Sequence, residues 1–169
     1  MGYIEKIQSM LQNGEISCVE LTEKYLKAIE EANGELNAYV TVTPEVALEQ
    51  AKQVDEKIKR GEKLLPLEGV PMTLKDNIST NGIETTCCSK ILKGYKPIYD
   101  AKVWEILKKN NAILLGKTNM DEFAMGSSCE TSCFGGATNP FNTDHVAGGS
   151  SGGVASAVGG DIAAFGLGS

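Results

Sequence analysis

Residues 67–77 read Leu-Glu-Gly-Val-Pro-Met-Thr-Leu-Lys-Asp-Asn, and this stretch decides the fold class. Val70, Met72 and Leu74 occupy alternate positions, which predicts a β-strand with these three side chains on one face. Pro71 cannot donate a ladder hydrogen bond, so we expect it near the start of this strand or on an edge of the sheet.

The residues further along alternate between helical and extended patterns. Asp100 is expected to cap a helix, and Thr118-Asn119 are expected to open a short helix through Phe123. Between them, Ala112–Leu115 form a continuous apolar run before Gly116, which predicts a strand buried on both faces. Strands that alternate with helices predict an α/β architecture.

Residues 1–61 are predicted to form a helical scaffold. Ser17–Glu20 have the pattern of a capping box, and Asn33-Gly34 are expected to end the helix that it begins. An extended piece over 38–43 leads to Pro44, which is predicted to be the first residue of the next helix.

Composition and charge exclude several function classes. The 169 residues include 16 Lys+Arg and 22 Asp+Glu, for a net charge of −6, and Arg60 is the only arginine. Such a chain is a poor candidate for gripping nucleic acid through its own phosphate contacts. His145 is the only histidine, which excludes a metal site built on two imidazoles. No apolar run approaches the roughly 20 residues that span a bilayer, so no membrane partner is expected.

The five cysteines are odd in number and irregular in spacing, which indicates reduced thiols in a cytoplasmic protein. The alternative is a zinc site made of Cys129, Cys133 and His145, and that set lacks a second ligand pair. We therefore expect no metal site.

Gly148–Gly153 read Gly-Gly-Ser-Ser-Gly-Gly and run into the small apolar residues 154–158. A flexible linker would not lead into a helical pattern, and the spacing matches neither a phosphate loop nor a dinucleotide-binding turn. The remaining interpretation is a turn that holds two serines at a helix N-terminus, where the helix dipole favours developing negative charge.

A serine nucleophile requires a base. His145 is close in sequence but lies in a polar stretch, whereas Lys75 ends an apolar alternating strand. A lysine can act as a base when burial lowers its pKa by several units. Lys75 is the best candidate among the lysines, and the alternative is a solvated lysine at the end of a strand.

Four ordered motifs together resemble the amidase signature family. They are Gly69–Asn77, Gly116–Gly126, Phe134-Gly135 with Asn139-Pro140, and Gly148–Gly153. The resemblance implies a mixed β-sheet layered with helices, of which only the N-terminal part is present. It makes residues 1–169 the N-terminal part of a single amidase domain, with the catalytic core starting at residues 64–169 and truncated there.

The resemblance also implies the site, a Ser–cis-Ser–Lys triad. Lys75 corresponds to the family's lysine and Ser150 to the bridging serine of the cis peptide. The acyl-forming serine corresponds to a position beyond Ser169, which stands where relatives usually have threonine. Ala147 replaces a proline that usually precedes the paired serines, a change expected to loosen entry into the turn.

Met125, Gly126 and Ser127 correspond to a loop that lines the substrate pocket in relatives. The surrounding stretch resembles most closely the glutamine-hydrolysing subunits of tRNA-dependent amidotransferases. These supply ammonia for converting misacylated Glu-tRNA(Gln) or Asp-tRNA(Asn) to Gln-tRNA(Gln) or Asn-tRNA(Asn).

That likeness implies a heterotrimer with subunits B and C, in which a partner subunit uses ATP and Mg²⁺ and makes most of the tRNA contacts. This chain would bind no cofactor itself, and without the acyl-forming serine it is expected to be inactive alone. The alternatives are a stand-alone amidase that hydrolyses small amides and a non-catalytic module with a glycine-rich ligand turn.

Overall fold

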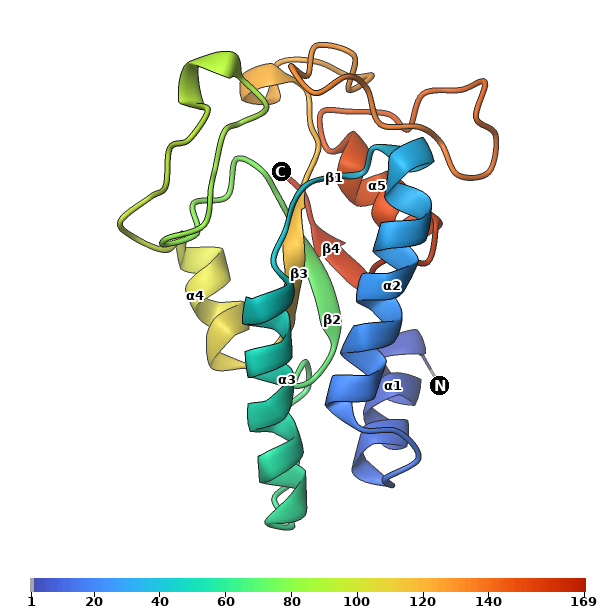
Figure 1. Cartoon of the computed structure of the whole chain (residues 1–169), viewed down its shortest axis with the longest axis vertical. Coiled ribbons are helices and arrows are strands. Elements are labelled where there is room, and N and C mark those ends of the chain that lie inside the picture. Colours follow the sequence, from blue (N-terminus) through green and yellow to red (C-terminus); the bar gives the residue numbers. More distant parts are fainter. Residues whose placement is uncertain (1) are drawn as a thin grey trace.

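The structure, a computed structural model, describes residues 2–169 as a four-stranded β-sheet layered with helices (Figure 1). The helices are α1 (Tyr3–Gln12), α2 (Cys18–Leu36), α3 (Pro44–Lys59), α4 (Lys102–Lys109) and α5 (Gly152–Gly159), with short 3-10 turns η1 (Lys90–Leu92) and η2 (Glu122–Ala124). The strands are β1 (Tyr39–Val42), β2 (Pro71–Lys75), β3 (Ile113–Thr118) and β4 (Phe165–Leu167). The expected α/β class is confirmed.

The sheet is mixed, with the strand order β1-β3-β2-β4. β2 pairs in parallel with both β3 and β4, whereas β1 pairs with β3 in the antiparallel direction. β2 and β3 are therefore the inner strands, and every residue of both is buried. Pro71 is the first residue of β2, where its missing N–H costs the ladder nothing.

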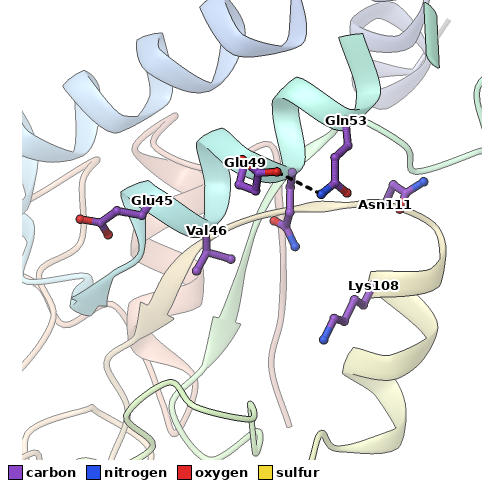
Figure 2. A pocket seen from close by; sticks show the side chains of 7 residues that line it. Glu45, Val46, Glu49, Gln53, Lys108 and Asn111 are labelled. Atoms are coloured by element: carbon purple, nitrogen blue, oxygen red, sulfur yellow. Dashed lines mark hydrogen bonds between the residues drawn. The ribbon is translucent and has the colours of Figure 1, made fainter. Parts of the chain in front are cut away.

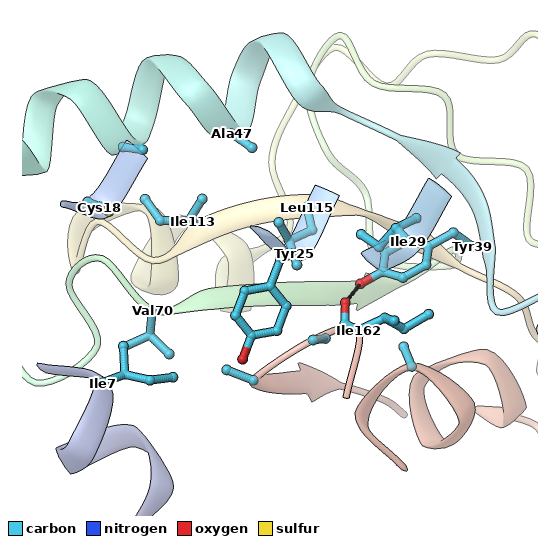
Figure 3. Close-up of a cluster of buried hydrophobic side chains, with 14 of the residues drawn as sticks. Ile7, Cys18, Tyr25, Ile29, Tyr39, Ala47, Val70, Ile113, Leu115 and Ile162 are labelled. Carbon is cyan, nitrogen blue, oxygen red and sulfur yellow. Dashed lines mark hydrogen bonds between the residues drawn. The ribbon is translucent and has the colours of Figure 1, made fainter. Parts of the chain in front are cut away.

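Two apolar clusters cover the two faces of the sheet. On one face, Ile113 and Leu115 of β3 join a cluster that contains Ile7, Ile29 and Ala47, from α1, α2 and α3 (Figure 3). On the other face, Leu114 joins a cluster with Trp104 of α4. Because neighbouring residues of β3 enter different clusters, the prediction of a strand buried on both faces is confirmed.

The predicted common face of residues 70–74 is wrong at one position. Met72 and Leu74 lie together in the cluster under α4, but Val70 belongs to the cluster under the N-terminal helices. Val70 precedes the first residue of β2, so the strand alternation does not extend to it.

The capping box at the start of α2 is confirmed. The Ser17 hydroxyl accepts from the Glu20 N–H at 3.1 Å, and the Glu20 carboxylate accepts from the Ser17 N–H at 2.9 Å. The helix does not end at Asn33-Gly34 but runs to Leu36. The Asn33 side chain instead pairs with both backbone polar groups of Tyr39, at 2.7 and 3.0 Å, and so joins α2 to β1.

Two helix starts also differ from expectation. Ala101, not Asp100, is the N-cap of α4; the Asp100 carboxylate accepts from the Asn81 N–H at 2.7 Å and from Lys108 Nζ at 3.2 Å. Thr118 is the last residue of β3 and opens no helix, and the short turn after it begins at Glu122. Among the helices described over residues 2–169, none is long and apolar enough to cross a membrane.

Candidate active site

The carboxyl ends of three parallel strands and the long loops gather at one end of the molecule (Figure 1). Because β2, β3 and β4 run in the same direction, Lys75, Thr118 and Leu167 lie at the same edge of the sheet. Ligands of open α/β sheets bind at such carboxyl ends. This edge is therefore where a functional site is expected.

Lys75 and Ser150 are in direct contact at this edge. Lys75 Nζ donates to Ser150 Oγ at 2.6 Å, and the Lys75 side chain is fully buried. The peptide bond between Gly149 and Ser150 is cis, and Ser151 is the N-cap of α5. The expected turn with two serines at a helix N-terminus is present, and it brings Ser150 to a lysine 75 positions away in the sequence.

A third hydroxyl reaches the same amine. Lys75 Nζ donates to Ser169 Oγ at 3.0 Å and to the Ser169 carbonyl oxygen at 3.3 Å. Asn77 Nδ2 donates to the same Ser169 hydroxyl at 3.0 Å. Sequence reasoning assigned no role to Asn77; its position two residues after Lys75 was the available signal.

The electrostatics of the site favour a neutral lysine. Burial lowers the pKa of Lys75 below its ordinary value, and the nearby Asp121 carboxylate opposes part of that change. A neutral amine can accept a proton, so Lys75 can take the hydroxyl proton of Ser150 across their 2.6 Å contact. This arrangement can activate an oxygen nucleophile without histidine.

The Met125–Ser127 loop lies against the serine turn. A Cβ added at Gly149 would come within 2.7 Å of the Ser127 carbonyl carbon, so backbone meets backbone there. Gly126 lies as tightly against Asp121, since a Cβ at Gly126 would overlap the Asp121 carboxylate. Met125 is 80% exposed, so its side chain points away from this packing.

Other residues weighed in the sequence lie elsewhere. His145 is in an exposed loop, and Arg60 ends α3 with its guanidinium on Glu62 at 2.6 Å. The five cysteines are free, and within residues 2–169 no group of three or more His, Cys, Asp or Glu side chains is gathered as metal ligands would be. The turn that follows Ala147 is formed with alanine at that position.

Sequence reasoning missed a second buried lysine beside the site. Lys117 Nζ lies 3.6 Å from Asp76 Oδ1 and donates to Thr85 Oγ1 at 2.8 Å, and both charged side chains are almost fully buried. Burial lowers the pKa of Lys117 and raises that of Asp76. The available signal was the position of Lys117, only two residues after the apolar run that ends at Leu115.

A separate hollow lies between α3 and α4, at the opposite end of β3 (Figure 2). Its lining is mostly polar and consists of Glu45, Val46, Glu49, Gln50, Gln53, Lys108 and Asn111. Gln50 Oε1 accepts from the Leu114 N–H at 2.9 Å and so satisfies the edge of β3 there. None of the residues around the Lys75 amine lines this hollow.

Comparison with known proteins identifies the family. The sequence profile of the amidase family matches residues 20–169, nearly the whole chain. The chain belongs to the amidase signature family. The same edge of an amidase therefore holds the Lys75–Ser150 contact described above.

Similar proteins narrow the relationship. The A subunit of glutamyl-tRNA(Gln) amidotransferase from Thermoanaerobacter pseudethanolicus is 49% identical to this amidase over 166 residues, which are 98% of this chain and 34% of that protein. The solved glutamyl-tRNA(Gln) amidotransferase chain of the same type from Thermotoga maritima is 35% identical, with a TM-score of 0.75 over 89% of this chain and 30% of its own.

Another solved amidase-like chain is more similar in fold. It comes from a vestigial complex linked to the evolutionary origins of an s-triazine catabolic enzyme, and it is 35% identical with a TM-score of 0.92, covering 96% of this chain and 36% of its own. This amidase sequence thus spans about a third of the length of the relatives it matches.

Proposed function

We propose that this chain is the N-terminal third of the glutamine-hydrolysing subunit of a tRNA-dependent amidotransferase. The observation that carries the proposal is the 2.6 Å contact between the buried Lys75 amine and the Ser150 hydroxyl at a cis peptide bond. The 49% identity to a glutamyl-tRNA(Gln) amidotransferase protein over 98% of the chain supports glutamine as the amide.

The proposed chemistry is acyl transfer. Neutral Lys75 takes the proton of Ser150 while Ser150 takes that of an acyl-forming serine, proposed to follow Ser169. That serine oxygen bonds to the side-chain amide carbon of glutamine, and backbone N–H groups stabilise the oxyanion. The C–N bond breaks, the proton returns through Ser150 to the leaving nitrogen, and ammonia departs. Water then releases glutamate by the same route.

Met125, Gly126 and Ser127 are proposed to line the glutamine pocket. Their backbone lies against the Gly149–Ser150 turn, so a substrate held by this loop would sit next to the Ser150 hydroxyl. The exposed Met125 side chain is free to cover such a substrate.

The rest of the reaction is assigned to partners. A heterotrimer with subunits B and C would convert misacylated Glu-tRNA(Gln) or Asp-tRNA(Asn). A partner would use ATP and Mg²⁺, and this chain would carry no cofactor. The net charge of −6 suits a protein that releases ammonia while a partner holds the tRNA. A cytoplasmic location is part of the same proposal.

One observation favours a second candidate, a stand-alone amidase for small amides. The structure linked to an s-triazine catabolic enzyme matches this chain with a TM-score of 0.92, against 0.75 for the solved Thermotoga maritima amidotransferase chain. The fold is therefore compatible with both functions.

Glutamine hydrolysis by the full-length protein that carries this sequence separates the two candidates. The rate is measured alone, with partner subunits, and with partners plus misacylated tRNA and ATP. We expect the partners and the tRNA to raise the rate, because ammonia release is coupled to its use. A rate that is unaffected by them would contradict the transamidation proposal and favour the stand-alone amidase.

A further inference from the structure

Asp121 lies at the junction of the segments that form the candidate site. Its side chain is fully buried, and its backbone N–H donates to the Ser150 carbonyl oxygen at 3.1 Å. Ser150 in turn holds the Lys75 amine through its hydroxyl. Asp121 is thus one residue removed from the reacting amine.

The Asp121 carboxylate fixes the loop that follows the proposed substrate residues. Oδ2 accepts from the Cys129 N–H at 2.9 Å, and Oδ1 accepts from the Thr131 hydroxyl at 2.9 Å. The same carboxylate fills the space beside two glycines, since a Cβ at either Gly126 or Gly149 would overlap it. One side chain therefore holds the serine turn and the 125–131 loop together.

Asp121 is also the charged member of the group of side chains that face Lys75. The others are the thiols of Cys129 and Cys88, and burial raises the pKa of both, that of Cys88 to about 12. Both thiols are therefore neutral around neutral pH. Asp76, next to Lys75 in the sequence, faces Lys117 instead.

We propose that Asp121 is a positioning residue for the Lys75–Ser150 pair: it fastens the Ser150 turn to the 125–131 loop, and its negative charge sets the pH range in which Lys75 is neutral. The inference rests on the proposed function, because the protonation of Lys75 matters to turnover only if Lys75 acts as the base.

Asp121→Asn in the full-length protein tests the role of the charge. The asparagine oxygen can still accept from the Cys129 N–H, and its NH₂ group can donate to the Thr131 hydroxyl, so the contacts are kept while the charge is lost. The carboxylate favours protonated Lys75, so without it the lysine loses its proton at a lower pH. We expect the acid limb of kcat/KM to move down by about one pH unit. An acid limb that stays in place, or moves up, would overturn the proposal.

Two controls separate charge from structure. Asp55 also accepts two backbone N–H bonds, from Cys18 at 2.7 Å and Val19 at 3.0 Å, at the distant start of α2. Asp55→Asn should leave the acid limb where it is. Thr131→Val removes a bond to Asp121 without removing charge, so it should raise KM with the limb unmoved. An equal limb shift in either control would contradict the charge role.

Two further arms keep the test decisive. Asp121→Ser is the second variant if the asparagine protein does not fold, with the same direction of shift expected. All proteins are assayed on glutamine and on a simple aliphatic amide. If only the simple amide is hydrolysed, the proposed substrate fails while the limb still tests Asp121. If Lys75→Ala keeps the wild-type limb, the lysine base fails, whatever Asp121→Asn does.

Discussion

At the scale of single residues, burial of the Lys75 amine is the feature that links structure to chemistry. A fully buried lysine is costly as a cation, and here it is surrounded by the hydroxyls of Ser150 and Ser169 and not by a directly bonded carboxylate. Removing the charge from such a site relieves that cost. Function and stability are therefore expected to oppose each other at position 75.

Lys75→Met should abolish turnover and leave the protein at least as stable at neutral pH. Burial lowers the folded pKa of Lys75, so between that value and the ordinary lysine pKa of 10.5 the folded state binds fewer protons than the unfolded state. Wild-type stability therefore rises with pH through this window. The advantage of Lys75→Met should be greatest below the window and shrink through it. Urea unfolding of both proteins across this range measures it, and an advantage that grows with pH would contradict the account.

Lys75 and Ser150 could be singled out from the sequence because each sits in a recognisable local pattern, an apolar strand end and a Gly-Ser turn. Asp121 could not, because its importance arises from packing against Gly126 and Gly149, and the position of Gly149 relative to it is set by the tertiary fold. The roles of the site residues remain predictions from the resemblance.

At the scale of elements, the register between β2 and β3 determines which charges meet. Leu74 lies opposite Lys117, and Lys75 lies opposite Thr118. This register brings Lys117 beside Asp76, the residue that directly follows β2. The pair was not predictable, because the sequence does not state the register of two parallel strands.

A double-mutant cycle on this pair tests that pairing. Lys117→Met should lower the free energy of unfolding by about 3 kcal/mol or more, because it leaves the Asp76 carboxylate buried without its cation. Adding Asp76→Asn should restore part of the loss, since the remaining buried charge is removed. Urea unfolding of the single and double variants measures the coupling. Strictly additive losses would contradict a direct interaction between the two side chains.

Local patterns predicted the elements better than their ends. The capping box of α2 and the double-sided burial of Ala112–Leu115 follow from residues close in sequence. The end of α2 does not, because Asn33, which would be a helix terminator in isolation, is used to bond Tyr39. Tertiary contacts of this kind decide element boundaries.

At the scale of the whole molecule, the β1-β3-β2-β4 order places the ends of three parallel strands around one polar site. The α/β class followed from alternating patterns, and the mixed sheet followed from the family resemblance. The antiparallel β1 at one edge was not predictable from propensity, because its pairing partner β3 is more than 70 residues away. The chain spans about a third of its relatives, so the proposed reaction belongs to the full-length protein.

The most direct test of the central claim is the kcat for glutamine hydrolysis of the full-length Lys75→Ala protein, with the exposed-lysine variant Lys102→Ala as its control. If Lys75 is the base that acts through Ser150, kcat should fall by about a thousandfold. KM should change little, and the control should retain wild-type turnover. A Lys75→Ala protein that keeps most of its kcat would contradict the account.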